Sequence, residues 1–127
     1  MKLIILIFFL FSQSLVYGAG SSSSIDANQE YLKAENLIKS EKYENAIKAL
    51  NNLLSETPDG YTKADLYNYL GYATRKQKNP DFELAEEHYL KALELDSDHI
   101  GALEYLGELY YETNRKDKAV EMLMRLK

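Results

Sequence analysis

The two histidines are the side chains of this chain best suited to acid–base or metal chemistry, and their spacing favours neither. His88 and His99 stand eleven positions apart, with no His-Glu-x-x-His motif and no other metal-ligand spacing around them. Glu86 and Glu87 precede His88, but consecutive residues of a helix point in different directions and cannot form one site. A solvated helix face explains this cluster better than catalysis does.

Other catalytic motifs are missing from the sequence. It contains no Gly-x-Ser-x-Gly, no phosphate-binding Walker loop and no Gly-x-Gly-x-x-Gly. It contains no cysteine, which excludes thiolate nucleophiles, thiolate metal sites, disulfide bonds and a cysteine-linked lipid anchor. The sequence therefore predicts a protein that is not an enzyme and that uses no cofactor and no metal.

The length and the charge of the chain further limit the kind of protein and the kind of partner that it can have. The chain has 127 residues, which suits one domain. It carries 15 Lys and Arg against 20 Asp and Glu, a formal net charge of −5 at pH 7. A chain with this acidic balance offers no clustered cations to a phosphate backbone, so nucleic acid is not an expected partner. The content of 28% charged and 46% hydrophobic residues is typical of a globular protein.

The N-terminus has the pattern of a secretory signal peptide. Lys2 supplies a positive charge, and an unbroken apolar run follows over 3–11. Val16 and Gly18 then place small side chains three residues and one residue before a cleavage point. The run is shorter than the about 20 residues that a bilayer core requires. We expect cleavage after Gly18, with cleavage after Ala19 or Gly20 as alternatives, or a retained membrane anchor. Since the segment carries Lys2 and no acid, the mature chain would have 14 basic and 20 acidic residues, a net charge of −6.

Three segments of the remaining chain repeat one pattern. Gly71 and Gly107 are 36 residues apart, and Ala85 and Ala119 are 34 apart. The matching residues are, in turn, Ala34, Ala46, Leu50 and Leu53; then Tyr67, Leu70, Gly71, Thr74, Ala85, Tyr89 and Ala92; then Leu103, Leu106, Gly107, Tyr110, Ala119 and Leu123. This pattern resembles the tetratricopeptide repeat, a helical hairpin of about 34 residues.

Apolar periodicity leads to the same architecture. In each segment apolar residues recur at i, i+3 or i+4, and i+7, the spacing of one helix face. Caps are expected at Asp26, at Thr62, at Asn79 before Pro80, and at Asp98. The sequence predicts an all-α fold, an α-solenoid of about three hairpins behind a signal peptide. Six antiparallel helices are expected over 27–40, 43–56, 63–77, 81–95, 99–112 and 115–126.

The expected domain organisation follows from these patterns. A signal peptide is expected over 1–18, a flexible Gly/Ser linker over 19–25, and the tetratricopeptide repeat domain over 26–127. The three repeats are placed at about 26–58, 63–97 and 98–127. The small residues of the repeats are expected where paired helices approach closely.

The resemblance implies a binding surface. In such arrays the first helix of each repeat lines a concave groove that holds extended peptides or partner helices. The corresponding positions here are Asn68, Tyr69, Tyr72, Arg75, Lys76, Glu104, Tyr105, Glu108, Tyr111 and Glu112. The tyrosines are expected to lie outside the hairpin core. Basic side chains gather at one end and glutamates at the other, so the expected partner is basic near the glutamates and acidic or polar near Arg75.

The function expected from these patterns is protein binding. The chain is predicted to be an exported, non-enzymatic adaptor or scaffold with a protein or peptide partner and with no stable membrane insertion after signal cleavage. The periplasm is the expected compartment, on the assumption of a bacterial source. The alternative is a self-associating structural subunit, a homo-oligomer. Its last helix offers Val120, Met122, Leu123, Met124 and Leu126, more apolar positions than one face can bury, unless the chain continues beyond Lys127.

Overall fold

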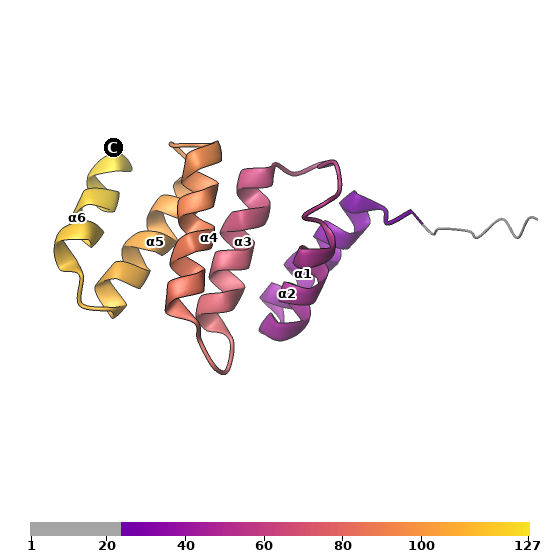
Figure 1. Cartoon of the computed structure of the whole chain (residues 1–127), viewed down its shortest axis with the longest axis horizontal. Coiled ribbons are helices and arrows are strands. Elements are labelled where there is room, and N and C mark those ends of the chain that lie inside the picture. Colours follow the sequence, from indigo (N-terminus) through magenta and orange to yellow (C-terminus); the bar gives the residue numbers. More distant parts are fainter. Residues whose placement is uncertain (1–23) are drawn as a thin grey trace, which may run out of the picture.

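A computed structural model describes residues 24–127, which form six helices and, over that range, no strand. Figure 1 shows the helices standing side by side in a row, with α1 and α2 at one end and α6 at the other. Their bounds are α1 (Ala27–Lys39), α2 (Tyr43–Asn52), α3 (Lys63–Lys76), α4 (Phe82–Leu95), α5 (Ile100–Glu112) and α6 (Lys116–Arg125). The predicted all-α solenoid is confirmed.

The helices pack as three consecutive hairpins, α1 with α2, α3 with α4, and α5 with α6. Contacts between α2 and α3 and between α4 and α5 join each hairpin to the next. One buried cluster fills the space between the first hairpin and α3, and a second lies among α4, α5 and α6. Tyr67 packs against both clusters, so the second hairpin links the two halves of the core.

The weak first repeat has the register that its small and apolar residues predicted. Ala34, Ala46, Leu50 and Leu53 are all fully buried, although this repeat lacks the Leu-Gly pair of the other two. The connection between α3 and α4 is longer than its counterpart in the third hairpin. It spans residues 77–81, two more than the connection over 113–115 between α5 and α6.

Two of the predicted helix caps are confirmed. The Asp26 carboxylate accepts a hydrogen bond from the Gln29 amide at 3.0 Å and begins α1. At α3 the Thr62 hydroxyl accepts from the Asp65 amide at 3.0 Å, while the Asp65 carboxylate accepts from the Thr62 amide at 2.8 Å. This reciprocal pair satisfies two backbone donors that the first turn leaves free.

Two other caps were placed wrongly. Asn79 does not cap α4, because the Asp81 carboxylate accepts from the Leu84 amide at 3.0 Å and starts the helix after Pro80. Asp98 does not cap α5, because the His99 ring accepts from the Ala102 amide at 3.1 Å. In each case a neighbouring side chain accepts the hydrogen bond of the free amide in the first turn and caps the helix instead.

The second helix is shorter than predicted. It ends at Asn52 rather than at residue 56, and Leu53 turns into the core, where it is fully buried. The ammonium group of Lys63 donates to the carbonyl oxygens of Leu53 and Leu54. These bonds satisfy carbonyls that a longer helix would have paired with later amides. Four of the remaining helices differ from the predicted bounds by one residue at one end, and α6 is one residue shorter at each end.

The predicted signal peptide over 1–18 and most of the linker lie outside the described residues. Within 24–127 no helix is long and apolar enough to cross a membrane.

Candidate functional site

The first helices of the three hairpins share one surface, here called the α1–α3–α5 face, and tyrosines cross it. The rings of Tyr31 and Tyr69 have centroids 5.6 Å apart, which joins α1 to α3. The rings of Tyr72 and Tyr105 have centroids 4.7 Å apart, which joins α3 to α5. Tyr69, Tyr72 and Tyr105 are half-buried, so each ring is held by a neighbour and still presents an edge to solvent.

Tyr69 is fixed further by its hydroxyl group. It donates to the Glu35 carboxylate of α1 at 2.9 Å. Burial of the ring and this hydrogen bond raise the pKa of Tyr69 to about 12. Tyr69 therefore stays protonated at neutral pH and acts as a donor that ties the first hairpin to the second.

The expectation that these tyrosines lie outside the core is wrong for two of them. Tyr69 packs against the buried cluster of the first hairpin, and Tyr105 packs against the cluster among α4, α5 and α6. Tyr72 belongs to neither cluster. Its ring meets the Tyr43 ring of α2 at 6.2 Å and the Tyr105 ring at 4.7 Å, and the Arg75 guanidinium lies 5.8 Å from its centre. Tyr72 is therefore the tyrosine that can be changed with least effect on packing.

Arg75 and Asn68 do not face a groove. Both are buried, and the Arg75 side chain is only 3% exposed. The Arg75 guanidinium donates to Glu108 at 2.7 Å and to Glu112 at 2.8 Å, both on α5. The prediction that Arg75 would meet an acidic group of a partner is therefore wrong, because this protein already supplies the carboxylates. Lys76, its neighbour, is exposed.

The predicted residues of α5 lie at a second surface as well. Glu104, Glu108, Tyr111 and Glu112 line a cleft between α5 and α6 with a volume of about 640 Å³. The rest of its lining is Leu103, Gly107, Ala119, Leu123 and Leu126. The ten predicted residues thus divide between buried positions under α5, the α1–α3–α5 face and this α5–α6 cleft, and their role in binding stays a prediction.

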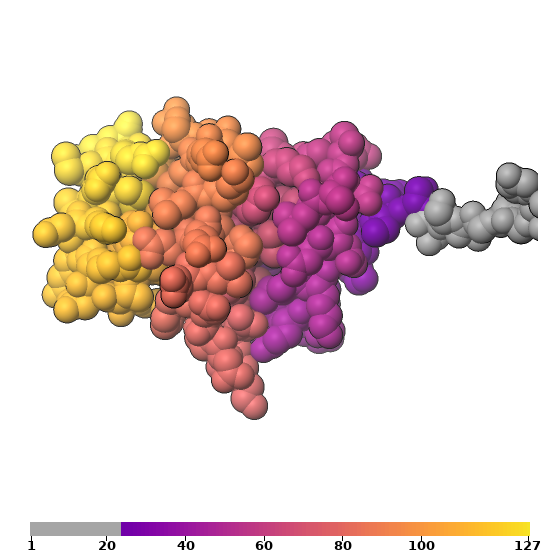
Figure 2. Space-filling model, in the orientation of Figure 1, coloured from indigo at the N-terminus to yellow at the C-terminus, as the bar shows by residue number. Residues whose placement is uncertain are grey.

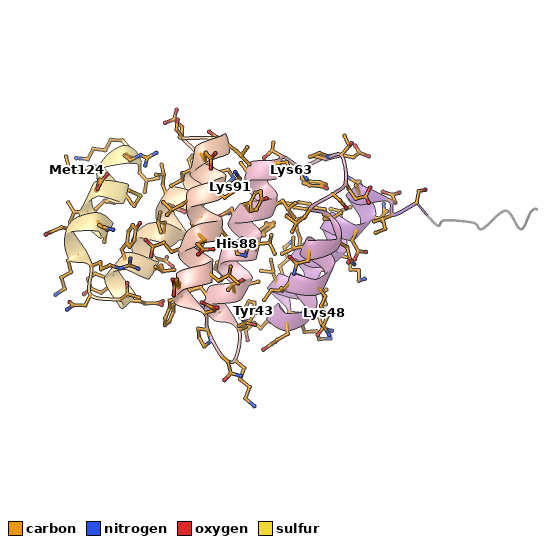
Figure 3. All side chains as sticks on the ribbon, viewed as in Figure 1. Tyr43, Lys48, Lys63, His88, Lys91 and Met124 are labelled. Carbon is orange, nitrogen blue, oxygen red and sulfur yellow. The ribbon has the colours of Figure 1, made fainter. Side chains whose placement is uncertain are left out.

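The histidines have structural environments. The His99 Nδ1 accepts the Ala102 amide, so Nε2 carries the proton and donates to the Asp65 carboxylate at 2.9 Å. Although burial opposes it, hydrogen bonding from His99 and Thr62 lowers the pKa of Asp65. His88 lies beside the Tyr67 ring, and burial lowers its pKa. Figure 3 shows His88 on α4, and residues 24–127 contain no group of three His, Asp or Glu placed to hold a metal ion.

Sequence reasoning missed two residues of the α1–α3–α5 face, Tyr31 and Glu35. Tyr31 stands 36 residues before Tyr67, the same offset that separates Gly71 from Gly107. Extending that offset into the first repeat would have placed Tyr31 on the first helix. No pattern pointed to the bond between Glu35 and Tyr69, because it depends on how the two helices cross.

A model of the tetratricopeptide repeat matches residues 64–99, a segment that contains α4 and all of α3 except its first residue, Lys63. Residues 64–99 of this chain are a tetratricopeptide repeat. The resemblance stated from the sequence is therefore confirmed.

Solved structures share the fold. MamA from Desulfovibrio magneticus RS-1 is 24% identical with a TM-score of 0.70, over 80% of this chain and 54% of that one. The second tetratricopeptide domain of Spaghetti (RPAP3), bound to an HSP90 peptide, is 21% identical with a TM-score of 0.67, over 78% of this chain and 82% of that one.

A third structure, PcrH in complex with the chaperone-binding region of PopB, is 20% identical with a TM-score of 0.68. It is matched over 80% of this chain and 79% of that one. The chain described here spans about half the length of the MamA chain. None of the curated proteins matches the chain described here.

Proposed function

We propose that this tetratricopeptide protein is an exported, non-enzymatic adaptor or scaffold that binds a peptide or helix of a partner protein on its α1–α3–α5 face. The observation that carries the proposal is the set of half-buried tyrosines, Tyr69, Tyr72 and Tyr105, spread over two adjacent first helices. Rings that are already held by neighbours lose little conformational entropy on binding, and they offer both apolar area and a hydroxyl group.

The charge of the face indicates the chemistry of the partner. Because Arg75 is buried, the positive charge that reaches the surface of this face is that of Lys76. The negative charges at the surface are those of Glu35, Glu104 and the carboxylate oxygen of Glu108 that Arg75 does not contact. This excess of carboxylates favours a partner segment that carries Lys or Arg and disfavours an acidic one. The similar folds of the RPAP3 domain with its HSP90 peptide and of PcrH with a region of PopB support peptide binding by a stack of this size.

Export rests on the sequence of the first eighteen residues. A basic start, a short apolar run and small residues before the cleavage point favour secretion, and a chain without cysteine suits an oxidising compartment such as the periplasm. Mass spectrometry of the protein isolated from the envelope fraction tests this point. A chain that begins at residue 19, 20 or 21 supports export with cleavage, whereas a cytosolic chain that begins at Met1 contradicts it.

Binding is tested with Tyr72→Ala, because Tyr72 lies outside both buried clusters. The matched control is Leu90→Ala, which removes a side chain that is 47% exposed on α4, a second helix of its hairpin. The tagged proteins are used to capture partners from the compartment in which the protein resides. We expect Tyr72→Ala to lose the partners that wild type and Leu90→Ala retain, with unchanged helical circular dichroism. The same partners on Tyr72→Ala would contradict the proposal.

A further inference from the structure

The α5–α6 cleft differs from the grooves of the other two hairpins. Leu66 and Leu70 of α3 close the groove of the first hairpin, and Ala102 and Leu106 of α5 close that of the second. Among residues 24–127 no helix covers the groove of the third hairpin, which leaves the cleft of about 640 Å³ open. In the space-filling view α6 forms one end of the row (Figure 2).

The lining of the cleft has the shape that a helix fills in the other two hairpins. Gly107 and Ala119 are small, so the α5 and α6 backbones form a shallow floor between them. Leu123, with 62% of its surface exposed, and Tyr111, with 67%, stand at the sides. Burying exposed apolar surface of this kind against a partner is favourable, because it removes that surface from water.

The outer edge of the cleft is acidic. Glu104, Glu108 and Glu112 recur every four residues along α5 and all line the cleft. Arg75 forms an ion pair with one carboxylate oxygen of Glu108 and one of Glu112, while Glu104 has no ion pair within 24–127. Three carboxylates against one guanidinium leave a net negative edge, so an occupant with cations at the same spacing is complementary.

The contacts of α3 with α5 show which positions of an occupant would meet this edge. Tyr72 of α3 touches Tyr105 of α5 with ring centroids 4.7 Å apart, and Arg75 reaches Glu108 at 2.7 Å. The residues that stand 36 positions after Tyr72 and Arg75 are Glu108 and Tyr111. A helix seated on α5 in the way that α5 sits on α3 would therefore bring one side chain to Glu108 and another, three residues later, to Tyr111.

We propose that the α5–α6 cleft is a second binding site, which takes one amphipathic helix of a partner protein. The occupant has an apolar face for Gly107, Ala119 and Leu123, and Lys or Arg four residues apart on one edge for Glu104 and Glu108. This goes beyond the proposed function, because the cleft is lined by α5 and α6 and contains none of Tyr69, Tyr72 and Tyr105. A second copy of this chain fits less well, since no two of its Lys or Arg residues are four positions apart in the sequence.

The test uses two synthetic helical peptides of about 16 residues, long enough to form a marginal helix. Both carry Leu and Ala at i, i+3, i+4 and i+7, and they differ only in having Lys or Gln at three edge positions four residues apart. Fluorescence anisotropy measures binding to wild type and to variants. We expect the Lys peptide to bind more tightly than the Gln peptide, and added salt to reduce that difference.

Matched variants locate the site. Glu104→Lys should weaken the Lys peptide about fivefold and Leu123→Asp about tenfold. Glu87→Lys and Leu90→Asp, which make the same changes at exposed positions of α4, should stay within about twofold of wild type. Tyr72→Ala should leave peptide binding unchanged, so failure of this site and failure of the α1–α3–α5 face are distinguishable.

Three results would overturn the proposal. The first is equal binding of the Lys and Gln peptides, or no binding of either. The second is an equal loss with Glu87→Lys and Glu104→Lys, which would show nonspecific attraction to an acidic protein. The third is a concentration-dependent dimer in sedimentation velocity without peptide that Leu123→Asp abolishes, since the cleft would then serve a second copy of this chain.

Discussion

The two glycines of the repeat pattern provide a matched pair of substitutions with opposite expected signs. Gly71 and Gly107 occupy the same place in consecutive repeats, and both face the second helix of their own hairpin. A Cβ atom added at Gly71 would lie 2.8 Å from two ring carbons of Tyr89. Tyr89 is fully buried, so its ring has no free space into which it could move. At Gly107 the nearest atom would be the Met122 Cβ at 3.5 Å, an ordinary contact.

The magnitudes follow from these distances. Overpacking a close-packed core costs about 1–3 kcal/mol. Alanine in place of glycine inside a helix gains about 1 kcal/mol. Gly71→Ala should therefore lower the free energy of unfolding by up to about 2 kcal/mol. Gly107→Ala should raise it by up to about 1 kcal/mol, because the higher helix propensity of alanine is gained there without overpacking.

The assay is chemical and thermal unfolding followed by helical circular dichroism, with residues 19–127 as the starting chain. For a domain of this size each kcal/mol corresponds to a shift in Tm of about 4–8 °C. The two variants should move in opposite directions from wild type. Gly71→Ala with a Tm equal to or above that of Gly107→Ala would refute the reasoning, because it would mean that Tyr89 can yield to the added methyl group.

Three further predictions test the contacts between hairpins. The double variant Glu108→Gln, Glu112→Gln should lower the free energy of unfolding by about 1–3 kcal/mol, because it leaves the buried Arg75 guanidinium without a charged partner. In an Arg75→Met background the same two substitutions should cost less, and a double-mutant cycle measured by urea unfolding tests this. Tyr69→Phe should cost about 0.5–1.5 kcal/mol at pH 7. Since the pKa of Tyr69 is raised to about 12, its contribution is present below the ordinary value of 10.0 and should fade as the pH rises from 10 to 12, so denaturation curves of the two proteins should converge there. The pKa of Asp65 is lowered on folding, so its contribution to the free energy of unfolding is present above the unfolded pKa and is lost as the pH falls below about 4. Asp65→Asn should therefore lose less stability in acid than wild type. An equal loss in the two proteins would contradict the role of the His99 bond.

The fold could be predicted because the repeat pattern is local and periodic. Gly71, Ala85 and Tyr89 mark where two helices of a hairpin meet, and all three are fully or nearly fully buried. The first repeat was harder because it lacks the Leu-Gly pair, yet Ala34 and Ala46 still sufficed to set its register. Helix lengths and number therefore followed from spacing alone, apart from the early end of α2.

The pattern did not separate the two glycines. Both were expected where paired helices approach closely, but only Gly71 excludes a methyl group. The reason lies in the facing residue, which is a tyrosine ring in the second repeat and a methionine Cβ in the third. A pattern records the type of residue, whereas the space beside it depends on the side chain across the interface.

The binding surface was harder to predict than the fold for the same reason. Periodicity placed Tyr72, Arg75 and Tyr105 on one side of their helices, but it could not show that α5 would cover Arg75 and supply Glu108 and Glu112 to it. Contacts between successive repeats depend on how the hairpins stack. The exposed apolar side chains of α6 were expected, and Val120, Leu123 and Met124 are each more than half exposed. Met124 lies at the α6 end of the molecule in Figure 3.

The central claim is that a partner protein binds on the α1–α3–α5 face, where Tyr72 lies, and not on the α4 surface around Leu90. A photo-crosslinking amino acid placed at position 72, with position 90 of α4 as the control, tests it in the compartment where the protein resides. The account predicts a discrete crosslinked partner from position 72 and none from position 90. The same adducts from both positions, or adducts from position 90 alone, would contradict it.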